Sequence, residues 1–184
     1  MIALLAVGGL YLALPDSLAA GPRWLQLAVV AVLLVPTIIS RRIGRHGLNM
    51  IFGHIVAGVV TLFTVWSLVL LVLALPGHKE PPVALLRSAV ALWISNVLVF
   101  ALWYWRLDVS HGAFLFPQMT RPDAHKPWTP QFLDYLFLAF NTSTAFSPTD
   151  TAVLSRWAKL MVMTQSSISL TVVVILAGRA VNIL

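Results

Sequence analysis

The chain contains no cysteine and few charged residues: of its 184 residues, 12 are Lys or Arg and 6 are Asp or Glu. Without cysteine there are no disulfides, thiolate metal sites or cysteine nucleophiles. The charged fraction is 10% and the hydrophobic fraction is 59%, whereas roughly a quarter of a soluble domain is charged. Apolar surface in this excess has to face lipid. The composition therefore predicts an integral membrane protein with the lipid bilayer as a partner.

The formal net charge is +6, and the basic residues stand singly or in short loops between apolar runs. Lys and Arg in such loops mark membrane topology, so we expect no nucleic-acid partner. No basic region precedes the first apolar residues, and we expect no cleavable signal peptide. No histidines have metal-ligand spacing, and no cofactor is expected.

Five apolar segments are predicted to be membrane helices. They cover residues 1–20, 24–40, 48–75, 83–107 and 153–184. A membrane span needs about 20 apolar residues, which the last three segments provide. Pro15 and Asp16 make the first segment marginal. Proline and glycine in the stretch "LPGHKEPP" separate the third segment from the fourth, because they end helices.

A sixth segment, residues 131–145, would form only about 22 Å of helix, too short to span. Thr129 is its candidate N-cap, Pro130 fits the first helical position, and Asp134 suits the positive end of the helix dipole. A short apolar helix that leads into polar backbone and then into a full span is typical of a re-entrant segment. The predicted fold is therefore all-α, with about five transmembrane helices plus one short re-entrant helix.

The C-terminal stretch "DYLFLAFNTSTAFSPTDTAVLSRWAKLMVMTQSSISLTVVVILAGRAVNIL" resembles the pore module of two-transmembrane-type potassium channels. In those channels a pore helix, a selectivity filter, a short loop and an inner helix follow one another. Laid without gaps, Thr142 and Thr144 match the filter threonines, and Asp150 matches the aspartate that closes the filter. The whole chain is also similar to a bacterial family of small membrane proteins of unknown function. The resemblance implies a multi-pass protein of the bacterial inner membrane.

The resemblance divides the chain into two parts. Residues 1–82 would form three N-terminal transmembrane helices, and residues 83–184 a pore-like module. Within the module the expected parts are an outer helix 83–107, a connecting loop 108–130, a re-entrant helix 131–145, a filter-like loop 146–152 and an inner helix 153–184.

The filter-like loop departs from the potassium-channel pattern. Ser147 and Thr149 replace the two filter glycines, Pro148 replaces the tyrosine, and Ser169 replaces the hinge glycine of the inner helix. Filter glycines supply a positive φ that points successive carbonyls at the ion, which Ser, Thr and Pro resist. We therefore expect a loop that does not select potassium. The candidate pore-lining residues are Thr142, Thr144, Ala145, Phe146, Ser147, Pro148, Thr149 and Asp150.

Two interpretations of this loop stay open. In the first, four chains gather around an axis, and hydroxyls with a ring of Asp150 carboxylates favour monovalent cations. In the second, the loop is a buried polar turn whose hydroxyls bond their own backbone, and Asp150 caps the last helix.

The last helix carries two polar faces, one with Thr164, Ser167 and Thr171 and one with Gln165 and Ser169. Such a face either lines a pore or packs against another helix, because small hydroxyl residues let helices approach closely.

Polar residues elsewhere in the apolar segments have a simpler interpretation. We expect Asn96 and His54 to make structural hydrogen bonds, because polar groups in lipid usually find a protein partner. Asp108 in the connecting loop is expected to be solvated. No histidine or lysine is placed to activate a serine, so an enzyme is not expected.

The distribution of basic residues conflicts with the channel resemblance. With all five segments spanning, eight basic residues share the side of the re-entrant opening: Arg41, Arg42, Arg45, Arg106, Arg121, Lys126, Arg156 and Lys159. The opposite side has four: Arg23, Lys79, Arg87 and Arg179. The positive-inside rule puts the eight in the cytoplasm, whereas the pore loop of a potassium channel enters from outside.

The leading hypothesis is a homotetrameric, ion channel-like protein that is cation-conducting or degenerate. The alternative is a non-conducting structural or assembly protein that keeps the pore-module fold. Both follow from the same residues, and they differ in whether the polar loop lines a water-filled path.

Overall fold

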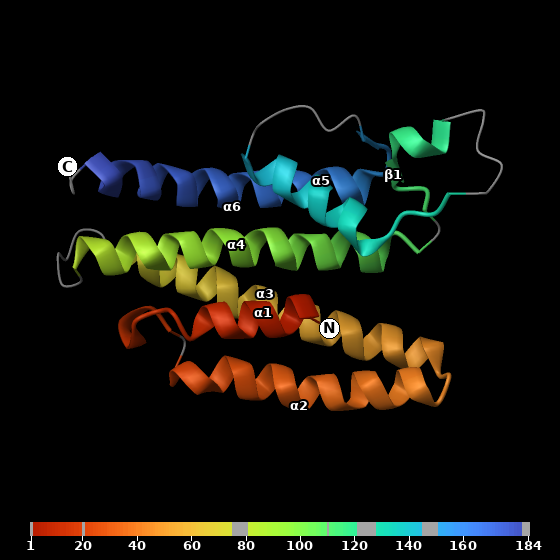
Figure 1. Ribbon diagram of the computed structural model, residues 1–184, viewed down its shortest axis with the longest axis horizontal. Coiled ribbons are helices and arrows are strands. Elements are labelled where there is room, and N and C mark those ends of the chain that lie inside the picture. The colour runs from red at the N-terminus through yellow and green to blue at the C-terminus, as the bar shows by residue number, and fades with distance from the viewer. Residues whose placement is uncertain are drawn as a thin grey trace.

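The computed structural model is an all-helical bundle and describes residues 2–19, 21–74, 81–109, 111–120, 128–144 and 151–181 (Figure 1). Its elements, in chain order, are α1 (Ile2–Tyr11), η1 (Asp16–Leu18), α2 (Arg23–Arg42), α3 (His46–Ala74), α4 (Pro82–Leu107), β1 (Phe114–Leu115), η2 (Pro117–Thr120), α5 (Phe132–Thr144), β2 (Ala152–Val153) and α6 (Arg156–Val181). The predicted all-α class is confirmed.

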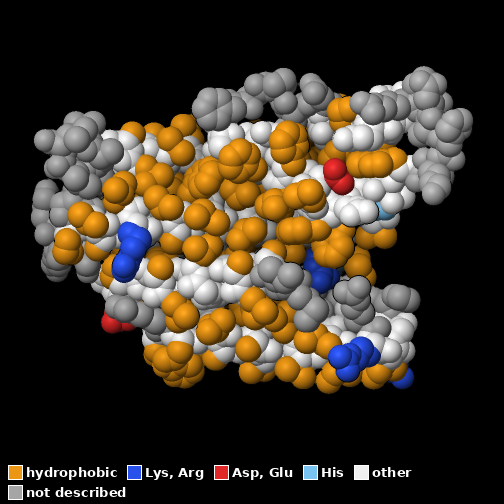
Figure 2. Space-filling view, viewed as in Figure 1, with side chains coloured by type: hydrophobic (Ala, Val, Ile, Leu, Met, Phe, Trp, Pro, Cys, Tyr) orange, Lys and Arg blue, Asp and Glu red, His pale blue; other side chains and the backbone are white. Residues whose placement is uncertain are grey.

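Three of the described helices are long and apolar enough to cross a membrane: Gly47–Ala74 in α3, Val83–Leu107 in α4 and Arg156–Gly178 in α6. At 1.5 Å per residue they measure roughly 35–42 Å, more than the ~30 Å hydrocarbon core of a bilayer. The apolar part of α2, Trp24–Ser40, is shorter. Hydrophobic side chains cover much of the face of the bundle that Figure 2 shows, as expected of helices that face lipid.

The first helix is shorter than the predicted segment 1–20. α1 ends at Tyr11, and the amides of Leu12, Ala13 and Leu14 then bond carbonyls three residues earlier at 3.0–3.1 Å. Pro15 follows, and its fixed φ and missing N–H prevent a continuous helix. The ten described residues of α1 make roughly 15 Å of helix, about half of the ~30 Å hydrocarbon core of a bilayer.

α4 is the central helix of the bundle. It packs against α1, α3, α5 and α6, whereas α2 packs against α1 and α3. Figure 1 shows α5 and α6 on one side of α4 and α1 and α2 on the other. Small, fully buried side chains on α4, such as Ala89 and Ala101, let its neighbours approach closely. α4 therefore joins the N-terminal helices to α5 and α6.

A small two-stranded sheet fixes the connection that follows α4 to the start of α6. β1 and β2 pair antiparallel with Phe114 opposite Val153, and the Leu154 amide donates to the Ala113 carbonyl at 2.8 Å. Phe114 is fully buried and meets three rings edge to face, those of Tyr104, Tyr135 and Trp157. The connection, predicted as a loop over residues 108–130, thus contains a buried anchor that holds the start of α6 beside the end of α4.

The antiparallel course of α3 and α4 predicts which loops share a side of the membrane. The α2–α3 turn and the end of α4 lie at one end of the bundle, and the start of α4 lies at the other (Figure 1). Ile43 belongs to that turn, Val109 follows α4, and Val83 is in the first turn of α4. All three side chains are more than 60% exposed. In the cysteine-free chain, Ile43→Cys and Val109→Cys should react with a membrane-impermeant maleimide from one side, and Val83→Cys from the other. Labelling of Ile43→Cys and Val109→Cys from opposite sides would contradict this arrangement.

Candidate functional site

α5 enters the bundle beside the end of α4. It begins at Phe132, and the Asp134 carboxylate accepts a hydrogen bond from the Gln131 amide at 2.7 Å. This bond satisfies one donor of the first helical turn, as acidic residues at the third helical position often do. The start predicted at Thr129 and Pro130 is wrong by two residues, because the residue at the N-cap position is Gln131, whose amide donates to the Asp134 carboxylate.

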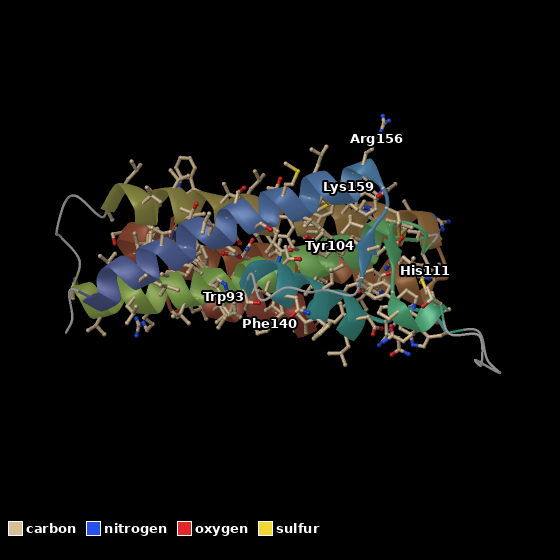
Figure 3. The ribbon with its side chains drawn as sticks, turned by 90° about the horizontal axis from the view of Figure 1, so that it is seen from above. Trp93, Tyr104, His111, Phe140, Arg156 and Lys159 are labelled. Atoms are coloured by element: carbon tan, nitrogen blue, oxygen red, sulfur yellow. The ribbon has the colours of Figure 1, made fainter. Side chains whose placement is uncertain are left out.

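α5 stops about halfway along its neighbours. Its 13 residues make roughly 20 Å of helix. Near its end, the Phe140 ring packs edge to face on Trp93 of α4 with the ring centroids 5.9 Å apart (Figure 3). Trp93 lies 14 residues before Leu107, the last residue of α4, which is about 21 Å from that end. The described chain therefore runs inward along α5 and starts α6 again at the end where α5 began.

Gln165 of α6 joins three helices at this depth. Its Oε1 accepts a hydrogen bond from the Tyr104 hydroxyl of α4 at 2.5 Å. Its Nε2 donates to the Ala139 carbonyl at 2.7 Å and to the Ser143 hydroxyl at 2.8 Å, both on α5. The Gln165 side chain is fully buried. A buried amide with all of these bonds made stabilises one arrangement of the helices, because any shift leaves a polar atom without a partner.

A second buried hydrogen bond connects α4 to α6 one turn further along. The Asn96 amide donates to the Ser169 hydroxyl at 2.8 Å, and both residues are buried. The structural hydrogen bond predicted for Asn96 is confirmed. For His54 the described residues give no such bond: its ring stacks on Trp103, and its Nε2 is buried without a hydrogen-bond partner in the described part of the chain.

The other polar face of α6 is exposed. The hydroxyls of Thr164, Ser167 and Thr171 each donate to the carbonyl four residues earlier at 2.9 Å, and all three residues are exposed. The two faces predicted for this helix therefore have different environments. The face with Gln165 and Ser169 forms hydrogen bonds inside the chain. The face with the three hydroxyls lies on the surface of the bundle.

The described residues at the end of α5 bond their own helix. Thr142 donates to the Leu138 carbonyl at 2.8 Å, and Thr144 donates to the Phe140 carbonyl at 3.1 Å. These bonds match the interpretation in which hydroxyls satisfy nearby backbone. The other predicted pore-lining residues, Ala145, Phe146, Ser147, Pro148, Thr149 and Asp150, lie outside the described residues.

Asp108 is buried, so the prediction that it is solvated is wrong. Only 1% of it is exposed, and its carboxylate accepts hydrogen bonds from the Ala113 amide and the Tyr135 hydroxyl, both at 2.9 Å. His111 Nδ1 lies 3.3 Å from the Tyr135 oxygen. Burial and then the hydrogen bond to Asp108 raise the pKa of Tyr135 above its usual range, so the phenol stays a neutral donor. This cluster fixes the start of α5 to the connection after α4.

Tyr104 and Ser143 are the site residues that the sequence did not indicate. Tyr104 stands in the aromatic run "LWYWR", which predicts only a membrane interface. Ser143 is one of several hydroxyls around Phe140–Asp150. The available signal was the buried amide of Gln165, because a glutamine inside an apolar helix needs partners on neighbouring helices.

The arrangement combines a saturated polar network with an exposed row of hydroxyls. Within the described ranges, no group of three or more His, Asp or Glu side chains is placed to hold a metal ion. Comparisons of the chain with protein-family models, with curated proteins and with solved structures give no match.

Replacing Gln165 tests the buried network. Gln165→Leu leaves the Tyr104 and Ser143 hydroxyls without their partner, so unfolding should become easier by about 1–3 kcal/mol. Thermal denaturation in detergent should show a lower Tm. Ser167→Ala is the matched control, because that hydroxyl is exposed and bonds only its own helix, and its effect should stay within about 0.5 kcal/mol. Equal Tm values for the two variants would contradict a stabilising role of the network.

Proposed function

We propose that this protein is a subunit of a cation-conducting pore in a bacterial inner membrane, assembled from four copies of the chain. In this arrangement α1, α2 and α3 are peripheral, α4 is the outer helix, α5 is re-entrant and α6 is the inner helix. The observation that supports the proposal most directly is the course of α5, which runs inward to about half the length of α4 and is followed by α6 from the same end.

The exposed hydroxyls of α6 also support the proposal. On a helix that faces only lipid, Thr and Ser side chains have a less favourable free energy of transfer into the membrane than aliphatic side chains. The row formed by Thr164, Ser167 and Thr171 would instead face a water-filled path or the same helix of another copy. Its neighbours Met163 and Leu170, both about 65% exposed, would face lipid or the adjacent copy.

A homo-oligomer is proposed because one re-entrant segment cannot enclose a pore. The outer face of α5 presents Leu133, Phe137 and Phe140, all exposed. Together with α4 it borders an apolar groove of about 420 Å³. Neighbouring copies would cover this face in an assembled pore, which is why four-fold closure suits the chain better than a monomer.

The proposed selectivity is for monovalent cations without preference for potassium. The segment after Thr144 has no glycine and contains Pro148, so it lacks the positive-φ positions of a carbonyl ladder. Hydroxyl side chains and a ring of Asp150 carboxylates would attract cations by charge and weak coordination.

The second candidate is a non-conducting structural or assembly protein with the same fold. The observation that favours it is the network of Gln165, Tyr104, Ala139 and Ser143, in which both polar atoms of the buried Gln165 amide find hydrogen-bond partners within one chain. This network needs no partner copy to satisfy its polar atoms.

Two expectations for the orientation of the protein in the membrane disagree. The basic end of the bundle includes Arg156 and Lys159 at the start of α6 (Figure 3). It also includes Arg42 at the end of α2 and Arg45 in the α2–α3 turn, and all four residues are exposed. The positive-inside rule favours the cytoplasm for this end, whereas the channel resemblance favours the outside. The side from which Ile43→Cys reacts decides between them.

Cysteine modification on α6 tests the pore-lining role. In proteoliposomes of the Ser167→Cys variant, a cationic thiosulfonate reagent should reduce cation flux at least severalfold, because it adds a positive charge to the path. Leu170→Cys is the matched control, exposed on the same helix three residues away, and its flux should not change. Absence of flux in the unmodified protein would favour the non-conducting candidate.

Removal of the Asp150 charge tests the proposed carboxylate ring. Asp150→Asn should lower cation flux and weaken the preference for cations over anions, since four negative charges disappear from the tetramer. Asp134→Asn serves as the control, because that carboxylate caps α5 near the surface. Unchanged flux in Asp150→Asn would contradict the charge ring, and a monomer in detergent cross-linking would contradict the tetramer.

A further inference from the structure

Arg106 lies directly on the backbone of a neighbouring helix. It belongs to the last turn of α4, and a β-carbon added to Gly53 of α3 would overlap the Nη1 and Cζ atoms of its guanidinium. Any other residue at position 53 would push the charged group away from α3. The missing side chain of Gly53 therefore leaves the space that the guanidinium of Arg106 occupies, and this space is called the seat of Arg106 below.

The charge of Arg106 has no partner among the described residues. Its Nε is buried without a hydrogen-bond partner, and no hydrogen bond or ion pair joins it to the described part of the chain. The nearby Asp108 carboxylate is already used by Ala113 and Tyr135. An unpaired buried cation is unfavourable, whereas a partly exposed one can be neutralised by an anion from outside. Arg106 is partly exposed.

A second group with unused hydrogen-bonding capacity stands next to this seat. His54 follows Gly53 in α3, and its Nε2 is buried without a hydrogen-bond partner among the residues that the structure describes. Its ring stacks on Trp103 of α4, with the centroids 5.8 Å apart and an interplanar angle of 29°. Trp103 is fixed in turn by donating from Nε1 to the Thr61 hydroxyl at 2.9 Å. The imidazole of His54 and the guanidinium of Arg106 thus lie in one region between α3 and α4, which is called the corner below.

The corner lies at the depth expected for lipid headgroups. It is at the end of α4 that carries Trp103 and Trp105, and indole rings concentrate at membrane–water interfaces. Figure 2 shows basic side chains at this end of the bundle, next to hydrophobic surface. Basic pockets between membrane helices bind the headgroups of anionic lipids, and guanidinium groups match phosphate geometry.

We propose that Arg106, seated on Gly53 and flanked by His54, binds the phosphate of an anionic phospholipid. The headgroup supplies the negative charge that the described residues do not, and its acyl chains lie along the apolar surface of α3 and α4. The site is outside α5 and α6, and it does not depend on ion conduction.

The test is lipid-dependent stabilisation of the full chain, purified in a neutral detergent. We expect phosphatidylglycerol to raise Tm, with an apparent Kd obtained by titration. Two probes separate the sources of stabilisation: diacylglycerol with the same acyl chains but no phosphate, and inorganic phosphate alone. Neither should reproduce the effect. Equal stabilisation by diacylglycerol would overturn the phosphate site, and equal stabilisation by inorganic phosphate would overturn lipid as its source.

The variants test which residues form the site. Arg106→Gln should weaken the apparent affinity for phosphatidylglycerol about tenfold, the loss expected for a charge-assisted hydrogen bond. Arg87→Gln, in an exposed position at the other end of α4, is the matched control and should keep the wild-type affinity. Gly53→Ala keeps the arginine but displaces it, so its affinity should also fall. An unchanged affinity in Arg106→Gln would overturn the proposal.

Two further variants keep the test decisive. If circular dichroism shows that Arg106→Gln is unfolded, Arg106→Lys replaces it, because lysine keeps the charge and loses the planar fork. That variant should bind more weakly than wild type, and wild-type affinity in it would overturn the guanidinium contact. Asp123→Asn removes a carboxylate outside the described residues and should leave lipid affinity unchanged. A gain in affinity there would show that Arg106 is paired within the chain and overturn the lipid site.

Discussion

The buried amide of Gln165 constrains the C-terminal half of the bundle. Its bonds to Tyr104, Ala139 and Ser143 require α4, α5 and α6 to meet at one depth and in one rotation. In an apolar interior the alternative is an amide without partners, which is unfavourable by several kcal/mol. The same rotation of α6 that buries Gln165 turns Ser167 outward. The exposed hydroxyl row is therefore a geometric consequence of the buried network.

The start of α5 is fixed by a second polar cluster. Asp108 bonds the Ala113 amide and the Tyr135 hydroxyl, and the β1–β2 pairing ties the same connection to the start of α6. α5 is thus held at both ends by groups that cannot move without losing hydrogen bonds. A helix too short to cross a bilayer gains from such anchors, because only three of its apolar side chains are fully buried, those of Tyr135, Leu138 and Ala139.

The N-terminal helices join this half through apolar packing and through one close contact. Leu14 and Leu18, which follow α1, are buried with Leu71 of α3 and Leu85 of α4. At the other end of the bundle, the missing side chain of Gly53 admits the guanidinium of Arg106. Arg106 therefore marks the end of the apolar part of α3 and α4, where the membrane meets water, as interfacial arginines do.

The membrane class, the approximate bounds of α3, α4 and α6, and the existence of a short helix before the last one could all be predicted from the sequence. Hydrophobic length and proline positions are local properties, and they survive any packing. The packing of the helices was needed to show that α1 ends at Tyr11, that Asp108 is buried, and which of the two polar faces of α6 forms hydrogen bonds inside the chain. Those outcomes depend on partners far away in the sequence, such as Tyr104 for Gln165, and periodicity identifies a face without identifying its neighbour.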